Sequence, residues 1–252
     1  MATEPMPTPM PEVETQARVS PFGRIFGVLF SPKPTFEDIA RKPTWLLPVL
    51  ILAILGTVVA VGINQKMNWR EYMSQQIEKS PAGAQLSADQ KQQRIEAGAK
   101  FAPISAYVFG IPAPVIVVLV VALIMWGAYN LLGGANLNYK TALAIVSHAY
   151  VPLIIANVLF LIVLFLKPYG TLDLDNPVAT NLAAFLPEDT AKWLLAIGKN
   201  LDIFVLWITV LIAIGFAAAN PKKLKGGKPY TIAFGMFAVW VILRVGAAFI
   251  FS

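Results

Sequence analysis

Five apolar stretches, each at least 19 residues long, constrain this chain more than any other feature. An α-helix rises about 1.5 Å per residue and the hydrocarbon layer of a bilayer is about 30 Å thick, so each stretch is long enough to cross it once. The sequence therefore predicts an all-α fold, a polytopic membrane helix bundle with five transmembrane helices. The stretches are Trp45–Ile63, Ile111–Leu132, Ala142–Leu166, Leu201–Ala219 and Tyr230–Phe251.

The composition excludes most other classes of protein. The chain is 57% hydrophobic and 13% charged with a mean hydropathy of +0.64, whereas soluble domains carry about 25% charged residues. It has no cysteine and one histidine, which leaves too few ligands for a metal site, and we expect no cofactor. The basic residues lie near helix ends without interleaved aromatic residues, so no nucleic acid is expected as a partner.

The N-terminal region divides into a tail and a short apolar segment. Residues 1–20 are rich in proline and glutamate, which predicts a disordered tail before a membrane domain over 21–252. Pro21–Phe30 is apolar apart from Arg24, and it is too short to cross a bilayer. We expect it to lie in the membrane interface, anchored by Phe22, Phe26 and Phe30. A core helix of a soluble domain is the alternative.

Three shorter helices are predicted from capping signals. Thr35 is suited to cap a helix through Ala40, and Asn68 with Glu71 a helix through Lys79. Ser87 and Gln90 have the capping-box spacing before a helix over 91–100. The two helices in the 64–103 connection either lie on the membrane surface or the bundle mouth, or act as solvated connectors.

Charge near the predicted spans indicates an orientation. Five spans place the tail, the Gly133-Gly134 turn and the 220–228 loop on one side, and these carry most of the lysines close to the membrane. The other side holds the 64–103 connection and the acidic 167–192 loop. Short basic loops stay in the cytoplasm, so we expect the N-terminus inside and the C-terminus outside.

The third stretch contains polar groups at membrane depth. Pro152 lacks an N–H group and predicts a bend that leaves the His148 carbonyl free. A polar helix-packing cluster of Asn130, His148, Pro152 and Asn157 is expected, in which His148 donates to or accepts from one of the two asparagines. A proton-handling role for His148 is the alternative.

Arg244 is a costly residue inside the fifth stretch. Insertion scales assign an arginine at the centre of a span roughly 2.5–3.5 kcal/mol. Asp202 of the fourth stretch lies at a similar predicted height, so an intramembrane Asp202–Arg244 ion pair is expected. The alternatives are that Arg244 extends to the outer headgroups, or that it belongs to an ion or substrate site.

Several short motifs follow one another in a distinctive order along the chain. They are Leu29–Pro32, Thr35-Phe36, Ile39, Pro43–Trp45, Pro48, Leu86–Gln90, Phe101–Ile104, Leu132–Gly134, Ala142–Ala144 and Pro152. Their order and spacing resemble the Yip1 family of membrane proteins in its bacterial form. The resemblance implies five membrane helices and a cytoplasmic N-terminus. Eukaryotic members are associated with vesicle traffic and small GTPases, but their Asp-Leu-Tyr-Gly-Pro type motif is missing here, so that partner is not carried over.

These features favour a non-enzymatic protein of the bacterial cytoplasmic membrane that organises membrane or acts as a trafficking-like adaptor. Its expected partners are the lipid bilayer and other membrane proteins, or a second copy of the chain. The alternative is a transporter or channel for a small solute, an ion or a lipid, with a polar path near Pro152. Enzyme is the least supported class, since no phosphate loop, nucleophile elbow or metalloprotease motif is present.

Overall fold

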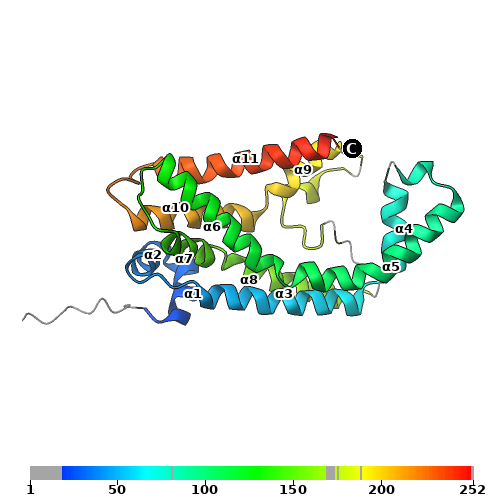
Figure 1. Cartoon of the computed structure of the whole chain (residues 1–252), viewed down its shortest axis with the longest axis horizontal. Helices are drawn as coiled ribbons and strands as arrows, with labels where there is room; N and C mark the ends of the chain where they lie inside the picture. Colours follow the sequence, from blue (N-terminus) through cyan, green and yellow to red (C-terminus); the bar gives the residue numbers. More distant parts are fainter. Residues whose placement is uncertain (1–18, 81, 169–173, 175, 188, 251–252) are drawn as a thin grey trace, which may run out of the picture.

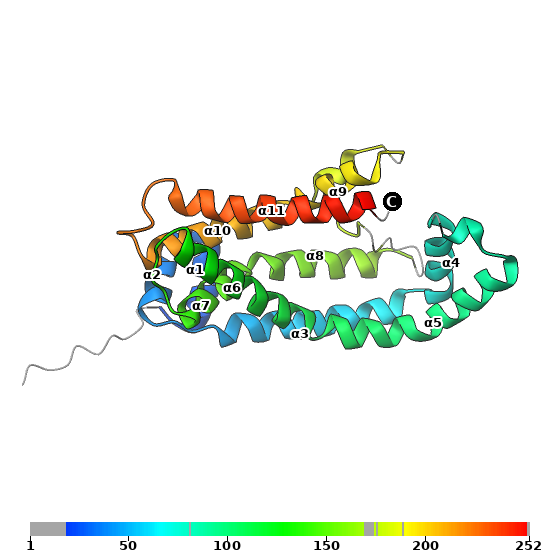
Figure 2. The same cartoon turned by 45° about the horizontal axis from the view of Figure 1, so that its top comes forward.

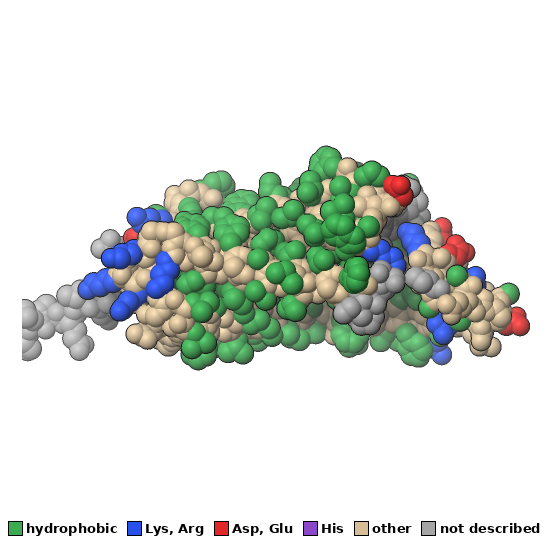
Figure 3. All heavy atoms as spheres, turned by 90° about the horizontal axis from the view of Figure 1, so that it is seen from above, with side chains coloured by type: hydrophobic (Ala, Val, Ile, Leu, Met, Phe, Trp, Pro, Cys, Tyr) green, Lys and Arg blue, Asp and Glu red, His purple; other side chains and the backbone are tan. Residues whose placement is uncertain are grey.

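The structure, a computed structural model, describes residues 19–80, 82–168, 174, 176–187 and 189–250. These residues form an all-α, elongated bundle whose long helices run roughly parallel to its long axis (Figure 1). On the face seen in Figure 3, hydrophobic side chains cover the middle of the bundle and charged side chains gather at its two ends. This distribution matches a protein whose middle lies in hydrocarbon. The predicted disordered tail lies, up to residue 18, outside the described residues.

Four lengths of helix in the described part of the chain are long and apolar enough to cross a membrane. They are α3 (Leu46–Lys66), α6 (Ala113–Leu131), α7 (Tyr139–Ala149) together with α8 (Pro152–Leu166), and α11 (Lys228–Ile250). The fourth predicted stretch forms α10 (Ile203–Ala219), whose 17 residues extend about 26 Å. This helix is shorter than the other four because it begins at Ile203, two residues later than predicted, with Asp202 as its N-cap. The count of five spans is therefore not confirmed.

The connection between α3 and α6 is a helical hairpin at one end of the bundle (Figure 2). Asn68 caps α4 (Trp69–Lys79), and both hydrogen bonds of the predicted Ser87–Gln90 capping box are present at the start of α5 (Ala88–Gly110). The prediction that this second helix ends near residue 100 was wrong. It continues through Pro103 because the following residues are apolar and pack against α3.

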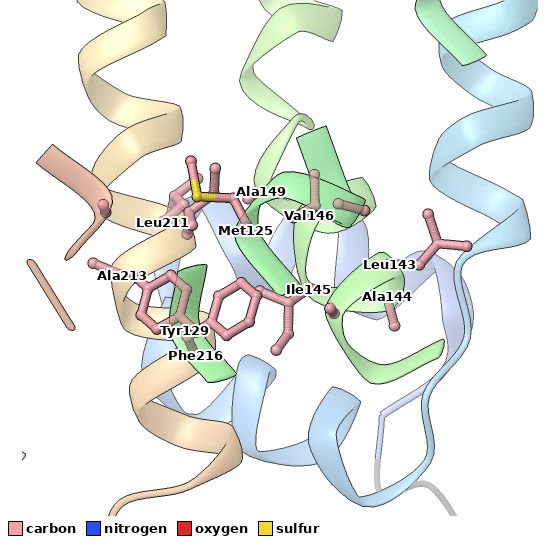
Figure 4. Close-up of a cluster of buried hydrophobic side chains, with 14 of the residues drawn as sticks. Met125, Tyr129, Leu143, Ala144, Ile145, Val146, Ala149, Leu211, Ala213 and Phe216 are labelled. Atoms are coloured by element: carbon pink, nitrogen blue, oxygen red, sulfur yellow. The ribbon is translucent and has the colours of Figure 1, made fainter. Parts of the chain in front are cut away.

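A buried helix, α7, forms the centre of the opposite end. Thr141 to Ala149 are all buried, and α7 packs against α6, α10 and α2 (Pro32–Arg41). Figure 4 shows Ile145 of α7 beside the paired rings of Tyr129 and Phe216. These two rings stack with centroids 3.9 Å apart, which joins α6 to α10. The larger of the two buried clusters thus lies at this end of the bundle, and a smaller one is formed by Met67, Phe160 and Leu164.

The α6–α7 turn and the lysine-rich α10–α11 loop are bonded to each other. Gly134 ends α6 in the left-handed conformation, at φ 65°, with its N–H bonded to the carbonyl of Asn130. Lys228 Nζ donates to the Gly133 carbonyl at 2.9 Å, and Asn220 Nδ2 donates to the Ala135 carbonyl at 2.8 Å. The two connections therefore lie at the same end of the molecule.

The break between α7 and α8 falls where proline predicts it. Helix stops at Ala149 and resumes at Pro152. The expectation that the His148 carbonyl stays free was wrong, because the chain tightens into a turn in which the Val151 N–H donates to it at 3.1 Å. The bend therefore leaves no unsatisfied carbonyl at His148.

The bundle predicts which exposed positions share a compartment. The chain has no cysteine, so Lys140→Cys, Lys225→Cys, Gln85→Cys and Lys199→Cys each introduce one reactive thiol at an exposed position. With α10 crossing, a membrane-impermeant maleimide labels positions 140 and 225 from one face, and 85 and 199 from the other. Labelling of 199 and 225 from the same face would contradict a crossing by α10.

Candidate functional site

The candidate site is the helical cap formed at the core end by α1 (Pro21–Phe30), α2 and the start of α3. Its central residue is Arg24, only 1% exposed although it carries a full charge. The Arg24 guanidinium forms an ion pair with Asp38 of α2, with Nη2 2.9 Å from Oδ2. Nε donates to the same carboxylate oxygen at 3.0 Å. A charge removed from water is tolerated only when it is paired and hydrogen-bonded in this way.

The remaining donors of Arg24 reach the chain that leads into α3. Nη1 donates to the Lys42 carbonyl at 3.0 Å and to Thr44 Oγ1 at 2.7 Å, and Nη2 donates to the Asp38 carbonyl at 3.2 Å. One side chain thereby fixes α1 to the end of α2 and to the entry of the first apolar span. Thr44 is an acceptor for Arg24, and Trp45 occupies the cap position of α3.

The local sequence brings α1 and α2 close together. Ser20 caps α1 by accepting a hydrogen bond from Gly23 N at 3.0 Å, and Ser31 separates the two helices. A Cβ atom at Gly27 would overlap the side chain of Thr35, so glycine permits the close approach. The predicted cap at Thr35 was wrong, because helix already begins at Pro32 and the buried Thr35 hydroxyl donates to the Ser31 carbonyl.

The outer face of α1 presents the three predicted anchor residues. Phe22, Phe26 and Phe30 recur every four residues and therefore form one stripe along the helix. They are 65%, 63% and 82% exposed, whereas Val28 on the opposite face is completely buried. Exposure of large aromatic side chains to water at these fractions is energetically unfavourable, and contact with lipid at the membrane interface removes that cost.

The four residues of the predicted polar cluster do not converge. Asn130 exchanges two hydrogen bonds with the backbone of Leu137 and stabilises the α6–α7 turn. His148 Nδ1 lies 2.8 Å from the Ala144 carbonyl, and Asn157 Nδ2 donates to the Leu153 carbonyl at 2.7 Å. His148 and Asn157 each use the carbonyl four residues back in their own helix, and Asn130 uses the backbone of the turn that follows α6.

Asp202 and Arg244 likewise have separate surroundings and do not form the expected ion pair among the described residues. Asp202 Oδ1 accepts from the N–H groups of Phe204 and Val205, and Oδ2 accepts from the Thr180 hydroxyl at 2.5 Å. These bonds use the carboxylate as the N-cap of α10. The Arg244 guanidinium lies over the Trp240 ring, 5.7 Å from its centroid.

An open groove of about 960 Å³ lies among α3, α5 and α8. Its walls are largely apolar, with Gly56 and Ala60 of α3 opposite Ala106 and Gly110 of α5. Asn157 lines the groove, whereas Asn130 and His148 do not. The shape and lining suit a hydrocarbon chain better than a hydrated ion.

The buried pair of Arg24 and Asp38 was missed by sequence reasoning. Its signal is a lone arginine in an otherwise apolar helix, followed fourteen residues later by an aspartate on the next helix. The prediction treated Pro21–Phe30 as a free interfacial segment. In such a segment Arg24 would contact water and would need no partner. A ten-residue helix with one buried face requires that its only charge be paired.

Comparisons with known proteins are consistent with this architecture. A family model described as the Yip1 domain matches residues 26–245. A protein of Bacillus subtilis (strain 168), Membrane protein YknW, is 29% identical over 230 residues, which cover 90% of this chain and 91% of that protein. No solved structure matches the chain.

Removal of one partner of the buried pair is expected to destabilise the fold strongly. Arg24→Met leaves the Asp38 carboxylate buried without its cation, a change that costs roughly 3–5 kcal/mol of unfolding free energy. Arg70→Met provides the matched control, because Arg70 and Glu96 form an exposed pair at 3.6 Å worth about 0–1 kcal/mol.

The measurement is a double-mutant cycle with Asp38→Asn, monitored by unfolding of the protein in detergent micelles. The double variant should be no less stable than Arg24→Met alone, because the orphaned charge is gone. Independent, additive effects of the two substitutions would show that the pair is not coupled.

Proposed function

The chain belongs to the Yip1 domain family of membrane proteins, and on that premise we propose that it is a non-enzymatic organiser of the bilayer. The observation that carries the proposal is the phenylalanine stripe of α1, exposed on a helix that Arg24 fixes to the bundle. The stripe inserts into one leaflet as a wedge, while the apolar spans anchor the protein. The wedge then serves to shape the membrane locally or to gather membrane-protein partners, including other copies of the chain.

Energetics support insertion of the stripe. Burial of a phenylalanine side chain contributes about 1.5–3 kcal/mol, so three largely exposed side chains supply a substantial part of a stable interfacial attachment. A free amphipathic segment spends part of that energy on ordering itself, whereas α1 is already ordered by its buried face. Its orientation relative to the bundle is fixed, which a wedge requires.

The proposed orientation places this cap on the cytoplasmic side of a bacterial cytoplasmic membrane, with α10 as a fifth span. Three lysines of the α10–α11 connection and Lys228 at the start of α11 lie at the same end as the cap, and the positive-inside rule assigns short basic loops to the cytoplasm. The N-terminus is then inside and the C-terminus outside.

A second candidate is lipid handling, favoured by the groove among α3, α5 and α8. Among a small solute, an ion and a lipid, a lipid chain fits the apolar walls of this groove best. Movement of a fluorescent phospholipid between the leaflets of proteoliposomes would favour this alternative over a static organiser, provided that the movement stops when the groove is blocked.

The wedge is tested in proteoliposomes with the full chain. Substitution of Phe22, Phe26 and Phe30 by serine removes the apolar stripe while the buried face of α1 is untouched, so the curved or small vesicles that the protein induces should be lost. The matched control replaces the same three residues by leucine and should retain the effect. Vesicle diameters at equal protein-to-lipid ratio, measured by electron cryomicroscopy, provide the readout, and an unchanged serine variant would refute the proposal.

A further inference from the structure

A basic pocket lies at the end of the bundle opposite the cap, between α9 (Lys192–Asn200) and α11. It has a volume of about 360 Å³, within the range of about 300–1,000 Å³ seen for small-molecule sites. Lys192 and Lys199 line it from α9, and Arg244 lines it from α11. The rest of the lining is Leu195, Ala196, Ala247 and Ala248.

Helical spacing explains why these residues share one pocket. The four lining residues of α9 occupy positions i, i+3, i+4 and i+7, which form a single face, and α9 packs against α11 through it. Arg244, Ala247 and Ala248 form the facing stripe of α11 by the same rule. The alanines leave space beside the three cations, and the ring of Trp240 lies against the guanidinium of Arg244.

The charge of this pocket is not balanced among the described residues. Their two ion pairs, Arg24–Asp38 and Arg70–Glu96, include none of the three cations. Lys192 is the first residue of α9, whose first turn has no acidic residue, so its charge adds to the positive end of the helix dipole. All three side chains are exposed, and three positive groups with a positive helix end around one cavity favour the binding of an anion.

The depth of the pocket indicates where that anion comes from. Arg244 lies sixteen residues after the start of α11 at Lys228, a rise of about 24 Å along the helix. In a hydrocarbon layer about 30 Å thick, this places the guanidinium close to the far headgroup level. Toward the membrane centre from Arg244, Trp240 and Leu243 of α11 are exposed and offer an apolar surface for acyl chains.

We propose that Lys192, Lys199 and Arg244 bind the phosphate headgroup of an anionic phospholipid, with its acyl chains along α11. The fork of Arg244 is suited to two phosphate oxygens, and the two lysines act as point charges on the α9 wall of the cavity. Basic pockets between helices on the cytoplasmic side of a membrane bind multiply charged lipid headgroups by the same chemistry. A lipid with two phosphates, such as cardiolipin, therefore binds more tightly than one with a single phosphate.

The test measures lipids retained by the full chain in native mass spectrometry from nanodiscs of phosphatidylcholine doped with phosphatidylglycerol or cardiolipin. The triple variant Lys192→Gln, Lys199→Gln, Arg244→Gln should lower the affinity for cardiolipin about a hundredfold. The matched control removes the same charge at the other end, as Lys222→Gln, Lys223→Gln, Lys225→Gln, and should keep the affinity. The single variant Arg244→Lys keeps the charge but loses the fork, and should give an intermediate affinity.

Two results would overturn the assignment. Equal losses in the two triple variants would indicate general charge attraction instead of a site. Displacement of the lipid by millimolar inorganic phosphate would indicate a site for free phosphate. A thermal unfolding midpoint for the first triple variant equal to that of the control variant shows that lost retention reflects binding, and the graded response of Arg244→Lys distinguishes binding from misfolding.

Discussion

The buried ion pair between Arg24 and Asp38 is the constraint on which the cap depends. A guanidinium that is 1% exposed must satisfy its donors within the protein, and here they reach α2, the Lys42 carbonyl and Thr44. This geometry forces α1 to lie across the entry of the first apolar span. The pair is a specifying interaction more than a stabilising one, because burying both charges costs nearly as much as their attraction returns.

The two ends of the bundle are stabilised in different ways. Most of the buried core surrounds α7, where the α2, α6 and α10 helices meet. The opposite half of the bundle has only a small buried cluster of Met67, Phe160 and Leu164, and many of its large side chains are exposed. Those exposed side chains are solvated by lipid, so the bilayer completes the fold there. The end with the larger core is also the end where the α6–α7 turn and the lysine-rich α10–α11 loop meet, and it can therefore hold α1 rigidly against the membrane.

Much of this arrangement is readable from sequence, because length, hydropathy and capping are local properties. Four spans, the caps at Asn68 and Ser87 and the break before Pro152 follow from neighbouring residues. The partner of Arg24 and the surroundings of Arg244 depend on which helices pack together. Asp202 illustrates the difference, since its own helix start offers two N–H donors and outcompetes an arginine on another helix.

The wedge requires α1 to be fixed with its phenylalanine stripe inside one leaflet. Because the chain has no cysteine, a single spin label is readily placed by Phe26→Cys in the full chain in liposomes. Its relaxation by membrane-dissolved oxygen and by a water-soluble nickel complex gives the depth of position 26. We expect position 26 to lie below the phosphates, where oxygen relaxes the label more than nickel does. A label at Lys225→Cys should be relaxed mainly by nickel. A label at position 26 that responds to nickel as strongly as the one at 225 would contradict the wedge.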